Sequence, residues 1–362
     1  MELKFRHIGL LMILALAISC SKDDGDMSGG NGELPPDSPL PIVFSCNMQE
    51  EKSVTRAGLE TEENSFTVYG FKNTGLIGTD NYTGSQIVFP GYMVKWTANS
   101  AGSSTTNTNG WEYVGQEPHG QEEQTVKYWD WSAKAYRFFG VTESYNKLDV
   151  TEANGVIKLS FKVDLTDPDG IAAIPYYSHL WFSNNNYELY PNRKFGGSVV
   201  LEFLQPLCKV RIMFVYEDPT KNDRTNTPLS DISFHRSDDN TIKQKGDVTI
   251  TYPLTGTGTK EECAFDTEAA GIDGFSTEYT DINPFWYTVL PISGQGTYTL
   301  DINVDGEPKT TIVPAEFMEW KPGYSYTYIF KIHVDGRVSI DAVQSAFTEW
   351  SVKEDTYTVY NW

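Results

Sequence analysis

Residues 198–216 read Ser198-Val199-Val200-Leu201-Glu202-Phe203-Leu204-Gln205-Pro206-Leu207-Cys208-Lys209-Val210-Arg211-Ile212-Met213-Phe214-Val215-Tyr216. They form two apolar, β-branched runs joined by a Gln-Pro pair. In the second run, Lys209 and Arg211 fall on one face of an extended chain, and Val210, Ile212 and Phe214 fall on the other. This alternation predicts strands of a sheet with one face in water.

Similar segments lie on both sides of this stretch, at residues 66–71, 86–96, 297–304 and 324–331. The last two precede Asp305-Gly306 and Asp335-Gly336, pairs that favour hairpin turns. Aromatic residues make up 14% of the chain, a composition typical of half-buried strands. No long segment after the N-terminal leader has the 3.6-residue period of a helix. We therefore predict an all-β fold with few short helices, as two antiparallel β-sandwich domains at residues 41–195 and 196–362.

The N-terminus has the features of an export signal. Lys4 and Arg6 precede an apolar run at residues 8–18, which is too short to span a bilayer. Ala17-Ile18-Ser19-Cys20 then resembles a bacterial lipobox, in which residues 1–19 are removed and Cys20 is acylated. An ordinary signal peptide that contains a cysteine is the alternative. Residues 20–40 are rich in Asp, Gly, Ser and Pro, which predicts a flexible tether.

Composition excludes several classes of function. The net charge of -21 argues against a nucleic-acid partner, because phosphate binding needs clustered Lys and Arg. The five histidines are scattered, and no cysteine spacing suggests zinc. We read Cys46, Cys208 and Cys263 as structural. No motif supports a nucleotide site or an enzyme, so we expect no catalytic residues, no cofactor and no metal.

Several short motifs, taken in order, resemble those of the fimbrillin family of Bacteroidetes, the subunits of protease-assembled pili. They are the lipobox at Cys20, a first strand Ile42-Val43-Phe44-Ser45-Cys46, the element Thr55-Arg56-Ala57, the strand at residues 66–71, the apolar run at residues 200–210, and Trp320-Lys321-Pro322-Gly323-Tyr324-Ser325-Tyr326. Many relatives have a His near Gln205 and an Ala near Cys208, so this chain departs from the pattern there. The resemblance spans residues 41–362.

The resemblance implies transthyretin-like sandwich domains and export as a surface-exposed lipoprotein anchored by its lipid in the cell outer membrane. A trypsin-like protease would cut between Arg56 and Ala57 and release the first strand, with Ile42, Val43 and Phe44. A strand from another pilus subunit would then fill the open sheet edge. The implied donor is the C-terminal tail, with apolar and aromatic residues at Val352, Tyr357, Val359, Tyr360 and Trp362. The alternative is that the tail forms the last strand of the subunit's own sheet.

Other roles stay open. The chain could be the anchor that keeps its lipid, or a tip subunit that binds a host or bacterial surface ligand. A different class of function is a monomeric surface lipoprotein that stacks glycans on exposed Trp129, Trp131 or Trp181. The strand-rich surroundings of these tryptophans favour core positions instead.

Overall fold

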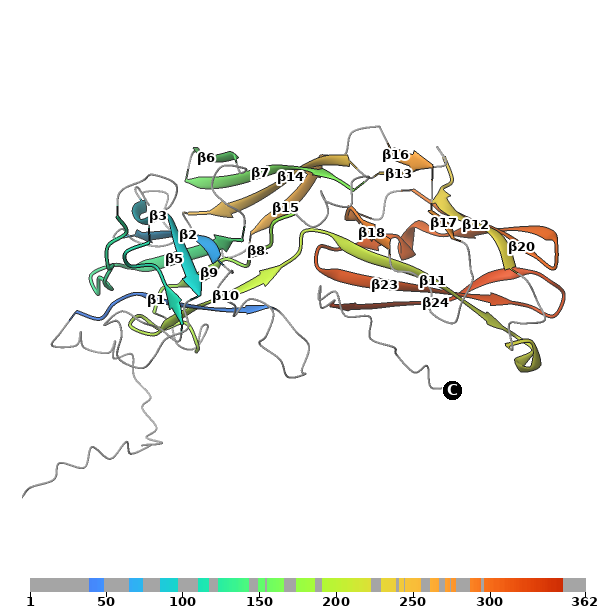
Figure 1. The fold of residues 1–362 in the computed structure, drawn as a ribbon, viewed down its shortest axis with the longest axis horizontal. Coiled ribbons are helices and arrows are strands. Elements are labelled where there is room, and N and C mark those ends of the chain that lie inside the picture. Colours follow the sequence, from blue (N-terminus) through green and yellow to red (C-terminus); the bar gives the residue numbers. More distant parts are fainter. Residues whose placement is uncertain are drawn as a thin grey trace, which may run out of the picture. The chain divides into compact units, whose positions relative to one another are not determined.

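A computed structural model describes residues 39–48, 65–73, 85–96, 110–116, 123–142, 149–153, 155–165, 174–185, 191–222, 229–238, 241–243, 245–254, 261–266, 271–273, 275–277, 287–293 and 296–347. These residues are predominantly strands (Figure 1). The only helices among them are two 3-10 turns, η2 (Pro219–Asn222) and η3 (Ala315–Phe317). Within the described part of the chain, no helix is both long and apolar enough to cross a membrane. The prediction of an all-β fold is confirmed.

The largest sheet has eight strands, in the order β1-β10-β8-β5-β2-β3-β4, with β9 paired to β5. Its members are β1 (Val43–Met48), β2 (Ser65–Asn73), β3 (Ser85–Trp96), β4 (Trp111–Glu112), β5 (Ala135–Val141), β8 (Tyr177–Ser178), β9 (Trp181–Ser183) and β10 (Ser198–Leu204). The predicted strand at residues 42–46 is therefore β1, shifted slightly toward the C-terminus. It lies at one end of this order.

A four-stranded sheet packs against one face of the large sheet. It has the order β15-β14-β7-β6, from β6 (Asp149–Ala153), β7 (Val156–Asp164), β14 (Lys245–Pro253) and β15 (Glu262–Asp266). The two sheets share one apolar core, in which the rings of Phe139 and Tyr252 stack with centroids 3.8 Å apart. Both β10 and β14 lie after residue 195 and yet pair with strands from before it. Strand pairing therefore crosses the proposed boundary at residue 195. The division of the chain into two tandem domains stays a prediction.

Two further four-stranded sheets enclose the core of the C-terminal half, in the orders β18-β11-β23-β24 and β17-β12-β20-β21. The strands are β11 (Cys208–Tyr216), β12 (Leu229–Arg236), β17 (Phe275–Thr277), β18 (Tyr287–Val289), β20 (Tyr298–Val304), β21 (Glu307–Val313), β23 (Tyr324–Ile332) and β24 (Val338–Phe347). Two short pairs complete the strands: β13 (Thr241–Lys243) with β16 (Gly271–Asp273), and β19 (Ile292–Ser293) with β22 (Glu319–Trp320).

The alternation predicted for β11 is present. Its residues are buried and half-buried in turn along the whole strand. Asp305 and Gly306, with φ of 54° and 82°, form the turn between β20 and β21, as the Asp-Gly pair predicts. Pairing is antiparallel throughout the described strands except at β1–β10 and β11–β23, which are parallel. The sequence did not predict these two parallel pairs.

Candidate functional site at the edge strand

The first strand occupies one edge of the large sheet and pairs only through β10 (Figure 1). The pairing is parallel and in continuous register from Val43 opposite Ser198 to Met48 opposite Phe203. The Ser45 and Ser198 hydroxyls lie 3.2 Å apart across the pair. Because an edge strand is bonded on one side, it can leave a sheet without breaking any other pair of strands.

Alternate side chains of this segment complete the core of the sheet. Ile42 and Phe44 are 0% exposed, and Cys46 is 8% exposed. The Phe44 ring packs edge-on against Phe89 and Phe138, with centroids 5.1 and 5.8 Å away. Full burial of an aliphatic or aromatic side chain contributes roughly 1.5–3 kcal/mol. Removal of the segment would therefore open an apolar cavity along β10.

Main-chain hydrogen bonds fix the entry of the strand. The Ile42 amide donates to the Lys127 oxygen over 2.8 Å, and the Trp129 amide donates to the Leu40 oxygen over 3.0 Å. The Tyr113 hydroxyl donates to the Ile42 oxygen over 2.9 Å. Burial raises the pKa of Tyr113 to about 12, so this hydroxyl stays protonated and remains a donor.

Tyr113 also shows how the sheet closes. It directly follows β4, at the opposite end of the strand order from β1, and yet it bonds to Ile42. The two ends of the order therefore meet over one core, which contains residues of both. The first strand is the piece that completes this closure.

At its other end the strand stops beside Phe203. Met48 pairs with Phe203, and the ring of Phe66, near the start of β2, lies 5.2 Å from the Phe203 ring. Residues 49–64 thus leave the sheet and return to it at one residue. This connection includes Arg56.

The structure places only part of the predicted site. Ile42, Val43 and Phe44 lie at the sheet edge, with Ile42 and Phe44 inward and Val43 half-buried. Outside the described residues lie Cys20, Arg56, Ala57 and the tail positions Val352, Tyr357, Val359, Tyr360 and Trp362. Sequence reasoning missed Tyr113, Lys127 and Phe203, because no local pattern links them to a strand so distant along the chain.

The tryptophans proposed as glycan platforms are core residues. Trp129 and Trp181 are 4% and 2% exposed, so their use as exposed stacking surfaces is wrong. Trp131 is half-buried and packs near the Phe195 ring, with centroids 6.2 Å apart. The interpretation of these residues as core, which the sequence favoured, holds for the two buried ones.

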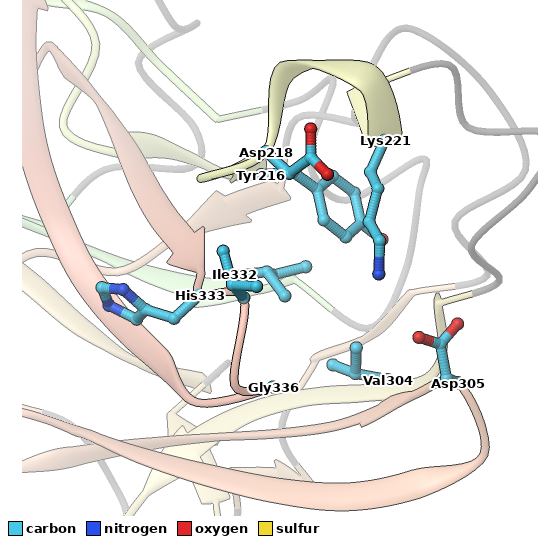
Figure 2. A pocket seen from close by; sticks show the side chains of 9 residues that line it. Tyr216, Asp218, Lys221, Val304, Asp305, Ile332, His333 and Gly336 are labelled. Atoms are coloured by element: carbon cyan, nitrogen blue, oxygen red, sulfur yellow. The ribbon is translucent and has the colours of Figure 1, made fainter.

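A small notch lies at one end of the C-terminal sheets (Figure 2). Tyr216, Val304 and Ile332 form its apolar floor, and Asp218, Lys221 and Asp305 line its rim. Its volume of about 50 Å³ is far below the roughly 300–1,000 Å³ typical of small-molecule sites. Across the described residues, no group of three or more His, Cys, Asp or Glu could hold a metal ion.

Comparison with known proteins gave no matching family model and no matching curated relative. Solved structures similar to this chain include a fimbrial protein from Bacteroides vulgatus, at 12% identity and a TM-score of 0.44, with 85% of this chain and 99% of that chain covered. A candidate cell adhesion protein from Bacteroides uniformis has 16% identity and a TM-score of 0.37, covering 88% of this chain and 100% of its own.

A fimbrial assembly protein from Parabacteroides distasonis is also similar, at 13% identity and a TM-score of 0.36. The match covers 84% of this chain and all of the other. The neighbours of this chain thus include fimbrial and adhesion proteins. Their identities are too low to transfer a role to it.

Proposed function

We propose that this chain is a structural and adhesive subunit of a cell-surface pilus. It is exported as an outer-membrane lipoprotein acylated at Cys20, cut after Arg56 and polymerised by strand exchange. The observation that carries the proposal is β1, an edge strand that fills the core of its sheet and is joined to the rest of the chain by a single long connection.

A cut in that connection would change how β1 is held. In the intact chain β1 is covalently tethered, so its departure from the sheet is opposed by a high local concentration of the strand. After a cut at Arg56, only non-covalent contacts would retain it: the pairs with β10, the hydrogen bonds at its entry and the burial of Ile42 and Phe44. The excised segment can then exchange with any strand that offers better contacts.

The edge left behind is a template for another chain. Loss of β1 would leave the outer backbone groups of β10 unpaired above an apolar floor. A strand added there gains backbone hydrogen bonds, and its alternate side chains enter the positions of Ile42, Phe44 and Cys46. Contacts of this head-to-tail kind do not close on themselves and so give filaments.

The position of Arg56 supports cleavage there. It is the only arginine between Arg6 and Arg137, and acidic residues flank it. The ends of its connection lie beside Phe203, and a cut at Arg56 would separate β1 from β2 without a break inside any described strand. A trypsin-like protease would also accept Lys52, which lies in the same connection.

The test is limited proteolysis of the purified precursor with a trypsin-like protease. We expect a new N-terminus at Ala57 and a ladder of oligomers on a gel. Arg56→Ala should abolish the new N-terminus at Ala57, and Arg56→Ala combined with Lys52→Ala should abolish the ladder as well. Lys52→Ala alone, a charge-matched control, should preserve both. Cleavage at Arg56 without any oligomer at high protein concentration would contradict polymerisation by strand exchange and favour an anchor or tip subunit instead.

Acylation needs a separate experiment. In cells grown with a labelled fatty acid, we expect label on the precursor and none on the assembled pilus. Cys20→Ala should abolish the label on the precursor. Label that persists on the pilus-bound form would assign the anchor role instead.

A further inference from the structure

Residues 123–130, which contain no strand, bond to the chain just before β1. The Ile42 amide donates to the Lys127 oxygen over 2.8 Å. Two residues further along the same segment, the Trp129 amide donates to the Leu40 oxygen over 3.0 Å. We call residues 123–130 the clasp segment, because their main chain holds the entry of β1.

The clasp segment and β10 hold different parts of this stretch of chain. Pro41 and Tyr128 form an isolated antiparallel bridge between the two bonds of the clasp segment. The parallel register with β10 begins only at Val43, opposite Ser198. The clasp segment therefore holds residues 40–42, and β10 holds β1 itself. A first strand that separates from β10 can stay attached through its entry.

Both ends of the clasp segment are anchored to other parts of the large sheet. At its start, the buried Gln124 side chain accepts from the Met93 amide over 2.6 Å. The same side chain donates to the Met93 and Tyr113 oxygens, each over 2.7 Å. At its end, the Asp130 carboxylate pairs with Lys72 over 2.6 Å. None of these bonds involves β1, so they hold the clasp segment in place independently of it.

The clasp segment binds the side of β1 that leads toward the proposed lipid. Cys20 precedes residues 40–42 in the sequence, and Arg56 follows them. A cut at Arg56 therefore leaves Cys20 and residues 40–42 on one peptide and the clasp segment on the other. After the cut, the contacts between these two peptides are the link between the lipid and the rest of the subunit.

We propose that the clasp segment retains the cleaved subunit at the membrane, so that cleavage at Arg56 and departure of the subunit are separate steps. This inference rests on the proposed function, since it needs both the lipid at Cys20 and the cut. One net hydrogen bond corresponds to about 2–12-fold in a dissociation rate. The two main-chain bonds to Lys127 and Trp129 should together slow departure by about 5–150-fold.

The consequence is an interval in which the subunit is cut and still anchored. During this interval β1 covers β10 and the apolar core beneath it. An uncovered edge pairs readily with other chains, so a delay before departure limits unproductive association. The clasp segment, rather than the protease, then sets the time at which the edge of β10 opens.

The test uses the full lipidated precursor in vesicles of phosphatidylethanolamine and phosphatidylglycerol. After the cut, the vesicles are floated at intervals, which separates bound subunits from departed ones and from any oligomers. We expect the subunit to leave the vesicles more slowly than the cut chain appears on a gel. Gln124→Ala, which frees the start of the clasp segment, should speed departure about fivefold or more. Lys127→Ala, which keeps the main-chain oxygen, is the matched control and should leave the departure rate unchanged.

A second variant guards against misfolding caused by the loss of a buried side chain. Asp130→Asn, at the half-buried anchor at the other end of the clasp segment, should also speed departure. Departure of the wild type as fast as the cut itself, or equal departure rates in the wild type and both anchor variants, would overturn the inference. A precursor that does not float before the cut, or that resists cleavage, would instead count against the proposed function.

Discussion

The Tyr113 hydroxyl lies 2.9 Å from the main-chain oxygen of Ile42 and donates to it. The same hydroxyl accepts from the Lys127 amide over 3.1 Å, so one buried group joins the entry of β1 to the two segments beside it. This bond links the two ends of the strand order. It therefore reports on whether β1 is seated.

Replacement of Tyr113 by Phe should weaken this seating. The buried Ile42 carbonyl and the part-buried Lys127 amide would each lose a partner, which costs about 1–3 kcal/mol. We expect the free energy of unfolding to fall by that amount, and the β1 peptide to dissociate about 5–150 times faster after cleavage. Denaturant unfolding and peptide release measure the two effects. Tyr128→Phe, at a tyrosine 48% exposed, is the matched control and should change neither.

Phe44 and its neighbour Val43 should differ sharply in their contributions to the free energy of unfolding. Truncation of a fully buried Phe to Ala costs about 3–5 kcal/mol, because it opens a cavity. Val43 faces away from this core and is half-buried, so Val43→Ala should cost about 1 kcal/mol or less. Denaturant unfolding of the two variants makes the comparison. Equal losses would mean that β1 does not contribute its inward face to the core.

The pair His235–Asp301 should make stability depend on pH. The imidazole Nε2 lies 2.9 Å from the Asp301 carboxylate. Burial alone would lower the pKa of His235, but the Arg236 carbonyl and Asp301 raise it above its ordinary value. A raised pKa in the folded state stabilises the protein below the unfolded value of about 6.5, and this contribution is lost as the pH rises through the folded value.

We therefore expect the unfolding free energy of the wild type to exceed that of His235→Gln by more at pH 5.5 than at pH 8. Thermal or denaturant unfolding of both proteins at the two values checks this. A difference between wild type and His235→Gln that is constant with pH would show that the imidazole is neutral throughout.

Asp130 should make the stability of the folded state depend on pH at the acid end of the pH range. The side-chain hydrogen bond from Lys72, over 2.6 Å, and that from Ser132 lower the pKa of Asp130 to about 2. A lowered pKa stabilises the folded state above the unfolded value of about 3.9, and this contribution is lost as the pH falls toward 2. Asp130→Asn should therefore lower the midpoint of thermal unfolding at pH 6 more than at pH 2.5. Asp247→Asn, at an exposed carboxylate 4.0 Å from Lys162, serves as the control for loss of a surface carboxylate.

Local sequence patterns predicted the strands well where apolar residues alternate with polar ones. The alternation in β11 and the aromatic face of β23 both follow from a period of two, and they appear as buried faces of one core. Ser325 and Thr327, on the opposite face of β23, are also buried, which the pattern did not predict. The turns at Asp305-Gly306 and Asp335-Gly336 were also predicted, because Asp-Gly pairs suit the positive φ that such turns need.

Pairing between distant strands could not be predicted in the same way. The residues of β1 do not by themselves identify β10 as a partner, because the pairing joins segments that lie far apart in the sequence, as do the contacts of Phe44 with Phe89 and Phe138. The pairing of β7 with β14 is equally non-local. Composition also left open whether the tryptophans are exposed or buried, and the packing of Trp129 and Trp181 shows that these two belong to the core.

Cys46 gives the precursor a built-in chemical reporter. Its thiol is buried with β1, whereas Cys208, fully buried on β11, stays with the other side of the cut. A thiol-reactive dye should therefore spare Cys46 in the intact precursor and mark it only on the small peptide that departs. The time course of labelling would therefore give the rate at which β1 departs, without any engineered probe.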